Sequence, residues 1–187
     1  YAIAKIAGIM LCKSLRQQYG FDAISLMPTN LYGPGDNFDL SEGHVLAALI
    51  KKFCDAKHNR NNEVICWGTG TPFREFLHVD DLARACLFIL ENWDPKNNQA
   101  PKDKDNKPLS FINVGTGKDI SIKDLVYLIA KIVKFKGSIL WDKTKPDGTP
   151  KKQLDIKNIS KLGWKAEIKL EEGLISTINY YKNLNNY

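Results

Sequence analysis

The chain opens with the segment YAIAK, Tyr1–Lys5, and stays apolar as far as Cys12. Lys5 is the only charged side chain in this stretch, so a helix here is apolar on nearly every side. Because helices of that kind are buried on more than one face, we expect this one to pack against other elements. It is predicted to run to Tyr19 and to end at Gly20, since glycine adopts the left-handed C′ conformation without a steric penalty.

Tyr1 and Lys5 lie one helical turn apart, so their phenol and ammonium groups share one face of the helix. A cation held beside a phenol favours the phenolate and lowers the pKa of the phenol from its free value of about 10. Such a pair can give and take a proton near neutral pH. Most Tyr–Lys pairs of this spacing have no function. In an apolar helix, however, a single lysine requires a partner, because burying an unpaired charge is costly.

The composition is that of a soluble globular protein, with 43% apolar and 26% charged residues in a chain of 187. No apolar run approaches the length of roughly 18 residues that a membrane-spanning helix needs, so we expect a cytoplasmic protein without a membrane partner. The net charge of +6 suits an anionic partner. The lysines are scattered among Asn and Asp residues, so we expect no nucleic-acid partner. A nucleoside diphosphate is an anionic partner that also suits the positive net charge.

The cysteines are widely spaced and form no CxxC pair, and the histidines show no zinc spacing, so we expect buried free thiols and no metal. These cysteines are Cys12, Cys54, Cys66 and Cys86. The chain begins without methionine and without an N-cap residue before its first helix. We therefore expect a truncated or cleaved part of a longer protein.

A short buried strand is predicted at Phe21–Met27, followed by an ordered turn at Pro28–Gly35 with two prolines and two glycines. A loop at the carboxyl end of a parallel strand is where open α/β sheets bind ligands. A helix is then predicted from an N-cap at Ser41 to about Ala56. Its buried stripe comprises Val45, Leu49 and Phe53.

His44 falls in the first turn of that predicted helix. The positive helix terminus disfavours the imidazolium there and leaves the ring ready for proton exchange. A surface histidine without function is the alternative interpretation.

A strand is predicted at Glu63–Trp67, before a Gly-x-Gly sequence at Gly68–Gly70. This sequence is not a dinucleotide fingerprint, because the third glycine is missing and Pro72 blocks the helix that such a loop enters. We expect a glycine turn that presents Arg74 to an anion, since a guanidinium binds phosphate with two hydrogen bonds.

Asp80 and Asp81 are predicted to begin a helix that runs through Leu87 and Leu90, where their charges complement the helix dipole. We expect His78 beside them to take part in capping rather than to bind a metal.

The remaining chain alternates strands and helices. The predicted elements are a surface loop at 94–108, a strand at Phe111–Val114, a capping box at Ser121–Asp124 that begins a helix with Leu125, Leu128, Ile129, Ile132 and Val133, a strand at Ser138–Trp141, a rigid basic turn at Lys145–Lys152 and a final helix from Leu170 to about Leu184.

Several motifs together are more specific than any one of them. They are Tyr1-x-x-x-Lys5, Pro28–Pro34, Asn37-Phe38, His44, the segment Trp67–Phe76 with Arg74, Asn113–Gly115 and Lys145–Gly148. In these the chain resembles the extended short-chain dehydrogenases/reductases, in particular the GDP-L-fucose synthase family, along the C-terminal part of those enzymes. The family's N-terminal half is absent, with its glycine-rich phosphate loop, the Ser or Thr partner of the tyrosine and the cysteine that works with the histidine.

The resemblance implies an enzyme that converts GDP-4-keto-6-deoxy-D-mannose to GDP-L-fucose by epimerisation at C3 and C5 and reduction of the C4 ketone with NADPH. It implies that Tyr1 protonates the C4 oxygen, that Lys5 holds the nicotinamide ribose and tunes Tyr1, and that His44 is the acid in the epimerisations. The implied cofactor-binding residues are Lys5, Pro28, Thr29, Asn30, Leu31 and His44. The chain alone is expected to be inactive, because it lacks the cofactor loop.

The resemblance also implies that the GDP moiety contacts Lys52, Trp67, Arg74 and Lys152, with Asp147 nearby. The family often has arginine where Lys52 and Lys151 stand, and lysine keeps the charge but loses the bidentate fork.

The implied fold is α/β, the C-terminal part of a doubly wound, Rossmann-like parallel sheet interleaved with a smaller substrate domain. Residues 1–35 and 76–116 would complete the NADP-binding domain, and 38–72 and 117–187 would form the substrate domain. A homodimer through the first helix is expected. The alternatives are another sugar-nucleotide epimerase or dehydratase, and a non-catalytic GDP-sugar binding fragment.

Overall fold

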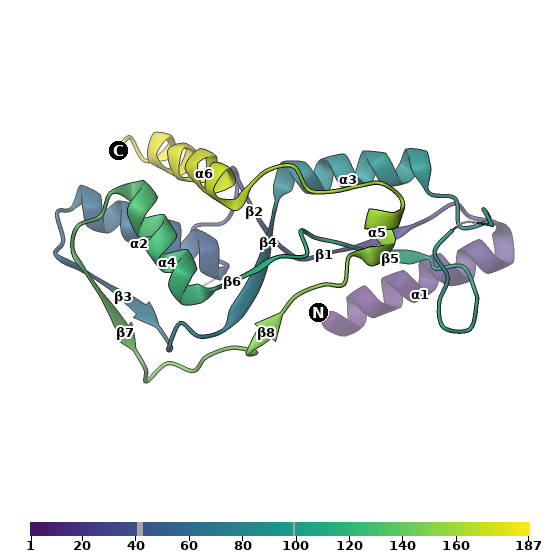
Figure 1. Cartoon of the computed structure of the whole chain (residues 1–187), viewed down its shortest axis with the longest axis horizontal. Helices are drawn as coiled ribbons and strands as arrows, with labels where there is room; N and C mark the ends of the chain where they lie inside the picture. The colour runs from purple at the N-terminus through teal and green to yellow at the C-terminus, as the bar shows by residue number, and fades with distance from the viewer. Residues whose placement is uncertain (41–42, 99) are drawn as a thin grey trace.

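The computed structural model describes residues 1–40, 43–98 and 100–187. Its helices and strands alternate along the chain (Figure 1). They are α1 (Ala2–Tyr19), β1 (Ser25–Pro28), β2 (Asn30–Tyr32), α2 (Val45–His58), β3 (Glu63–Trp67), β4 (Phe73–His78), α3 (Val79–Asn92), β5 (Phe111–Val114), β6 (Asp119–Ser121), α4 (Ile122–Val133), β7 (Ser138–Asp142), β8 (Lys151–Lys152), α5 (Lys157–Lys161) and α6 (Leu170–Leu184).

One part of the molecule is a parallel pair of strands between helices. β1 pairs with β5 in parallel, with Ser25 opposite Phe111, and Figure 1 shows α3 above and α1 below this pair. The core here comprises Leu77, Ala85, Ile89, Trp93, Ala100, Ile112, Val114, Ile159 and Trp164. This arrangement of parallel strands and helices is the α/β fold that the sequence predicts.

The other part packs three helices against short sheets. β2 and β4 are parallel, β3 and β7 are parallel, and β4 also pairs with β6 and β8. Helices α2, α4 and α6 cover a second core that includes Leu46, Ile50, Phe53, Leu125, Ile129, Leu174 and Ile178. These side chains recur at helical spacing, which gives each helix one apolar stripe.

Strand β4 connects the two cores. Phe76 belongs to the core under α2, α4 and α6, whereas its neighbour Leu77 belongs to the core beside α3. Successive side chains of a strand point to opposite faces, so one strand can bury residues on both sides. The boundaries of the two predicted domains stay a prediction.

Several predicted elements are confirmed. α1 ends at Gly20, which has a φ of 68°. Strands β3 and β5 have the predicted limits, α6 ends at Leu184, and Ser121 Oγ accepts a hydrogen bond from the Asp124 N–H at 3.0 Å. His78 is the N-cap of α3, where its Nδ1 accepts from the Asp80 N–H at 3.2 Å, as the prediction of capping requires.

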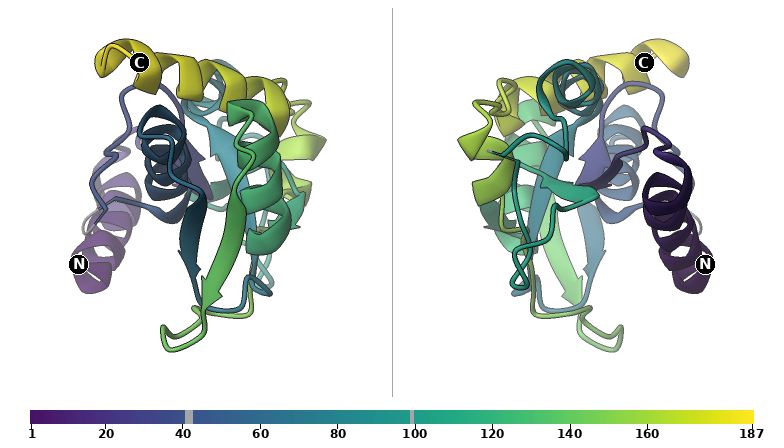
Figure 2. Two further views of the ribbon diagram at one scale, coloured as in Figure 1. Left: turned by 90° about the vertical axis from the view of Figure 1, so that its left-hand side faces the viewer. Right: turned by 90° about the vertical axis from the view of Figure 1, so that its right-hand side faces the viewer.

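The prediction that the first helix is buried was wrong. No residue of α1 is buried, and Ile3 is 83% exposed. Both views of Figure 2 show this purple helix at one side of the molecule. The apolar pattern correctly predicts a helix, but the described residues do not pack over its apolar side chains.

The predicted glycine turn is present, since Gly68 and Gly70 have positive φ, and Arg74 lies in strand β4 directly after it. Two local predictions need correction. Val45 is exposed, because the buried stripe of α2 runs through neighbouring positions. The proposed N-cap Ser41 lies outside the described residues, and His44 itself is the N-cap of α2.

All four cysteines are free thiols, as predicted, but only Cys54 and Cys66 are fully buried. Burial raises the pKa of each of these two thiols to about 11. Within the described residues, no helix is both long and apolar enough to cross a membrane.

Candidate functional site

The glycine turn after β3 holds the carboxylate of Asp147. Asp147 Oδ1 accepts from the Thr69 N–H at 2.9 Å, and Oδ2 accepts from Thr69 Oγ1 at 2.6 Å. These bonds, the side-chain bond first, lower the pKa of Asp147 below its ordinary value. Gly68 has a φ of 79°, and a Cβ there would lie 2.3 Å from Asp147 Oδ1, so the turn requires glycine at this position.

Arg74 is held on the strand that follows the turn. Its Nη1 donates to the Phe73 carbonyl at 2.7 Å and to the Thr149 carbonyl at 2.6 Å. Parallel pairing of β4 with β8 places Lys152 opposite Arg74 in register. The Nη2 group makes no hydrogen bond to any residue that the structure describes, so it is available to a ligand.

Three of the predicted substrate residues come together in one pocket. Trp67, Arg74 and Asp147 line a cavity of about 220 Å³ whose other walls are mainly apolar or glycine. The exposed ring of Trp67 has the Lys52 Nζ 4.9 Å and the Lys145 Nζ 5.5 Å from its centroid. We call this cavity, with the two lysines over the ring, the Trp67 pocket. An aromatic face beside several cations suits a base joined to phosphates.

His44 lines a second cavity at the start of α2. This cavity has a volume of about 230 Å³ and is also lined by Leu31, Tyr32 and Asp36. The next residue, Val45, lines the Trp67 pocket. His44 and Val45, which are consecutive at the start of α2, therefore line two different cavities.

The predicted cofactor segment Pro28–Leu31 runs from the last residue of β1 into β2. Thr29 Oγ1 and Asn30 Nδ2 both donate to the Glu75 carbonyl, at 3.2 and 2.8 Å. Leu31 lines the cavity of His44, whereas Pro28 ends β1. The segment is thus held rigidly at the sheet edge where α/β proteins bind ligands.

Glu75 is a residue whose importance the sequence analysis missed. Its side chain is 0% exposed. Oε1 accepts from the N–H groups of Thr116 and Gly117 at 2.6 and 2.7 Å, and Oε2 accepts from the Leu154 N–H at 2.8 Å. Glu75 therefore joins the loop after β5 and the segment after β8 to the strand that carries Arg74. The signal was a carboxylate in a strand that also contains Phe73, Phe76 and Leu77, because a carboxylate in such a strand rarely stays buried without partners.

Asp81 has a similar role on the other side of β4. Its buried carboxylate accepts from the N–H groups of Glu167 and Ile168, each at 3.0 Å, and from Arg84 at 2.5 Å. The sequence predicted only a contribution to the dipole of α3. The two backbone donors to Asp81 are 86 and 87 residues away along the chain, so no local pattern indicates them.

Tyr1 and Lys5 lie apart from these cavities. The Lys5 Nζ is 5.3 Å from the centroid of the Tyr1 ring, as the one-turn spacing predicts. Tyr1 is 97% exposed, and neither residue lines the Trp67 pocket or the cavity of His44. The described residues thus bring together the predicted nucleotide contacts but do not place the Tyr–Lys pair with His44.

Parallel strands with helices on both sides, together with a basic pocket at the strand ends, define a nucleotide-binding α/β protein. A model of the NAD dependent epimerase/dehydratase family matches residues 1–102, and the chain belongs to this family.

The chain is 49% identical over 181 residues to a protein of Oryza sativa subsp. japonica named probable GDP-L-fucose synthase 1, covering 97% of this chain and 51% of that protein. It is 50% identical to the GDP-L-fucose synthase of Escherichia coli, over 97% of this chain and 55% of that protein. Its fold matches the crystal structure of a GDP-L-fucose synthetase from Naegleria fowleri bound to NADP, with a TM-score of 0.82, 27% identity, and coverage of 100% of this chain and 56% of that one. The chain thus spans about half the length of the curated relatives it matches.

The residues predicted to contact a nicotinamide cofactor lie in two places. Pro28–Leu31 runs from the last residue of β1 into β2, and Lys5 is an exposed cation near the start of α1. The 187 residues contain no Gly-x-Gly-x-x-Gly sequence entering a helix, the usual cradle for the pyrophosphate of such a cofactor.

Proposed function

We propose that the chain forms the sugar-nucleotide side of an NADPH-dependent epimerase/reductase that converts GDP-4-keto-6-deoxy-D-mannose to GDP-L-fucose. The observation that carries the proposal is the pocket in which Trp67, Arg74 and Asp147 meet, next to the helix start that bears His44. The similarity to GDP-L-fucose synthases over 97% of the chain supports the same activity.

In this proposal the Trp67 pocket binds the GDP moiety. The exposed Trp67 ring offers an apolar face to the base, and Lys52 beside it offers positive charge. Arg74 and Lys152, adjacent on β4 and β8, bind the diphosphate, with Arg74 donating from the Nη2 that the described residues leave unpaired. Asp147 holds the glycine turn that shapes the pocket.

The chemistry then falls to residues near the sugar. The C4 carbonyl makes the protons on C3 and C5 acidic, so one site can serve both the epimerisations and the reduction. The cysteine that the resemblance places in the family's N-terminal half takes the proton from each carbon, and His44 then donates one to it. The Tyr1 phenol, beside Lys5, protonates the C4 oxygen. NADPH supplies the hydride when bound. Lys5, Pro28, Thr29, Asn30, Leu31 and His44 would contact the nicotinamide end.

The exposed apolar side chains of α1 support a homodimer through this helix. Ile3, Ile6, Met10 and Leu11 are all more than half exposed, and a second copy of the helix would cover them. A cytoplasmic location is supported by four cysteines that are all free thiols, as is usual in reducing compartments.

A second candidate is GDP-sugar binding without turnover by this chain alone. It is favoured by the contrast between the packed Trp67 pocket and the exposed Tyr1 and Lys5. Another sugar-nucleotide epimerase or dehydratase of the family is disfavoured by His44 together with the Lys145–Pro150 turn.

Calorimetric titration of the chain with GDP and with UDP tests the nucleotide part of the proposal. We expect saturable GDP binding that Arg74→Ala weakens at least tenfold, as the loss of a charge-assisted hydrogen bond predicts. Equal affinity for UDP, or no binding, would contradict it.

NADPH oxidation with the 4-keto sugar is measured in parallel, and we expect none from these 187 residues. Measured turnover would remove the candidate of GDP-sugar binding without turnover.

A further inference from the structure

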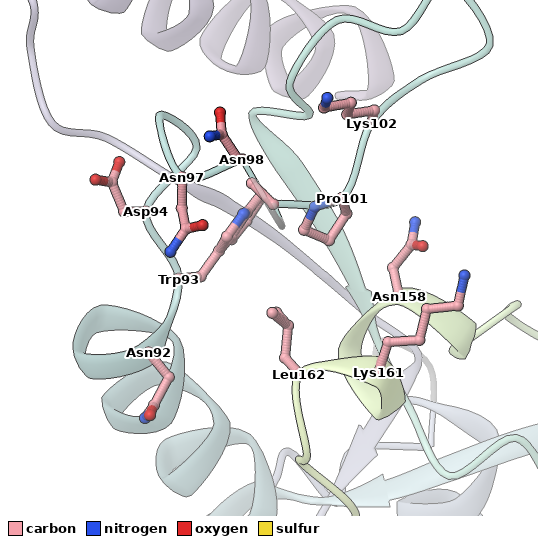
Figure 3. A pocket seen from close by; sticks show the side chains of 11 residues that line it. Asn92, Trp93, Asp94, Asn97, Asn98, Pro101, Lys102, Asn158, Lys161 and Leu162 are labelled. Atoms are coloured by element: carbon pink, nitrogen blue, oxygen red, sulfur yellow. The ribbon is translucent and has the colours of Figure 1, made fainter.

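A groove of about 750 Å³ runs along strand β3 beside the Trp67 pocket, and Trp67 lines both. The Trp67 pocket has a volume of about 220 Å³, whereas small-molecule sites usually have about 300 to 1,000 Å³, so a nucleotide bound there needs the further room that the groove offers. The cavity of about 550 Å³ at the end of α3 shares no residue with either. Figure 3 shows Asn92, Asp94 and Lys161 around it, a mixture of acceptors and donors that selects no class of ligand.

Asp142 lies next to Trp67 in the groove. Strands β3 and β7 pair in parallel with Trp67 opposite Asp142, and Figure 1 shows the two strands side by side. The preceding pair, Cys66 and Trp141, packs in the core under α2, α4 and α6. Because successive side chains of a strand point to opposite faces, Trp67 and Asp142 both point away from that core, and both line the groove.

The Asp142 carboxylate is held in place and keeps one oxygen for a ligand. Oδ1 accepts from the Thr144 N–H at 3.0 Å and from Thr144 Oγ1 at 2.5 Å. These bonds, the side-chain bond first, lower the pKa of Asp142 below its ordinary value, so the carboxylate is ionised near neutral pH. Oδ2 makes no hydrogen bond or ion pair with the residues that the structure describes. Asp55, another carboxylate of the groove, already accepts from the hydroxyls of Tyr181 and Tyr187.

A carboxylate beside an aromatic ring distinguishes the nucleobases by their edges, since proteins recognise an unpaired base by stacking and by hydrogen bonds to its Watson–Crick edge. An ionised carboxylate only accepts, and it can accept two hydrogen bonds side by side. Guanine offers two adjacent donors, its N1–H and its 2-amino group. Adenine has an acceptor at N1, and uracil has one N–H between two carbonyl groups. A site built around a hydrogen bond rejects a ligand that lacks it, so guanine is the base that fits Asp142.

We propose that Asp142 determines the base specificity of the Trp67 pocket by accepting hydrogen bonds from the N1–H and the 2-amino group of a guanine stacked on Trp67. The inference rests on the proposed function, because it takes the Trp67 pocket as the site of a nucleoside diphosphate. Arg74 and Lys152, which bind the diphosphate in that proposal, cannot distinguish GDP from other nucleoside diphosphates, because all of them carry the same diphosphate. Asp142 supplies the distinction.

Calorimetric titration with three nucleotides tests this role. GDP has both donors, IDP lacks the 2-amino group, and ADP has an acceptor at N1. We expect the wild-type chain to bind GDP about fivefold more tightly than IDP and at least tenfold more tightly than ADP, as the loss of hydrogen bonds to a charged group predicts. Asp142→Asn keeps an oxygen for Thr144, and it should weaken GDP binding about tenfold and reduce the preference for GDP over IDP to less than twofold.

Glu63→Gln is the matched control. Glu63 is an exposed carboxylate that lines the same groove at the other end of β3, and its loss should leave the preference for GDP unchanged. Inorganic pyrophosphate has no base, so it should bind to Asp142→Asn and to the wild-type chain with equal affinity.

The role of Asp142 and the proposed function fail in different ways. GDP binding without preference over IDP, an equal effect of the Asp142 and Glu63 variants, or an equal loss of GDP and pyrophosphate affinity in Asp142→Asn would overturn the role of Asp142 and leave the proposed function in place. No GDP binding by the wild-type chain would reject the proposed function, and the base specificity with it.

Discussion

The Trp67 pocket and the Tyr1–Lys5 helix carry two parts of the proposed chemistry, and they differ in how much of their surroundings this chain supplies. Around the pocket, Arg74 and Asp147 are fixed by hydrogen bonds to residues up to 78 positions away in the sequence. Around the helix, the Tyr1 ring contacts Lys5, only four residues along the chain. Nucleotide binding should therefore be a property of the chain itself, whereas the placement of Tyr1 requires a covering surface.

The difference extends to the burial of charge. Glu75, below the pocket, is a fully buried carboxylate with three backbone donors. Lys5, the only charge on the first half of α1, is exposed and needs no such network. Buried charges are tolerated only where the surrounding structure is complete, so Glu75 marks the region that this chain completes.

The largest effect is expected from Glu75→Ala. It leaves the N–H groups of Thr116, Gly117 and Leu154 without an acceptor, and we expect the free energy of unfolding to fall by about 3 kcal/mol or more. Urea denaturation followed by circular dichroism measures this change. Glu75→Gln, which keeps one carbonyl oxygen for Thr116 and Gly117, should cost less.

Glu171→Ala is the matched control for that experiment. Glu171 is an exposed glutamate paired with Lys131, and its loss should cost at most about 0.5 kcal/mol. If both alanine variants lose the same free energy of unfolding, Glu75 does not hold the pocket together, and the two regions do not differ as proposed.

Arg74→Lys should have the next largest effect, on affinity rather than on stability. Lysine keeps the charge but cannot donate both to the Thr149 carbonyl and to a phosphate in the planar geometry of a guanidinium. We expect GDP affinity to fall about tenfold, measured by calorimetry. Arg60→Lys, an exposed arginine outside both cavities, serves as the control, and an equal loss in that variant would argue against a role for Arg74.

These two regions also show what the sequence could and could not predict. Short-range patterns were enough for most elements: the limits of α1 at Gly20, the strand Glu63–Trp67, and the capping of α4 by Ser121. Each depends on residues within a few positions, where backbone geometry and side-chain chemistry act directly. The prediction that α1 is buried was wrong, because an apolar pattern indicates that a helix packs against something but not which chain or segment it packs against.

The candidate site was predictable to the extent that residue chemistry indicates a ligand. Arg74 was recognised from its type and the glycine turn before it, Trp67 only through the family resemblance, and the structure places both in one pocket. Glu75 and Asp81 were missed as anchors, because their partners lie in segments that only folding brings near. The glycine turn before Arg74 was predicted, whereas the pairing of β4 was not, because its three partner strands lie in other parts of the sequence.

The glycine turn of the Trp67 pocket should respond to acid. Thr69 lowers the pKa of Asp147 below its ordinary value of 3.8. The folded chain therefore gains stability from the ionised carboxylate above that value and loses it as the pH falls through the lower pKa of the folded state. The Thr69 amide signal, followed by NMR from pH 6 downward, should change with a midpoint below 3.8.

Thr69→Val removes the side-chain hydrogen bond and should move the Asp147 midpoint up towards 3.8. Asp142 provides an internal control, because its pKa is lowered by a different residue, Thr144, and should not change in this variant. An unaltered Asp147 midpoint in Thr69→Val would mean that the turn is not held by this contact.

The smallest effect on stability is expected on α1. Ile6 is 60% exposed, so Ile6→Ala removes little buried surface and should change the free energy of unfolding by at most about 0.5 kcal/mol. Ile50→Ala, in the core under α4 and α6, is the matched change and should cost about 2 to 5 kcal/mol. Urea denaturation at low protein concentration compares the two. A large loss in Ile6→Ala that grows with protein concentration would show that a second copy covers α1, because only a cover formed by association makes stability depend on concentration. The exposed helix and the complete pocket would then differ in the source of their packing and not in its strength.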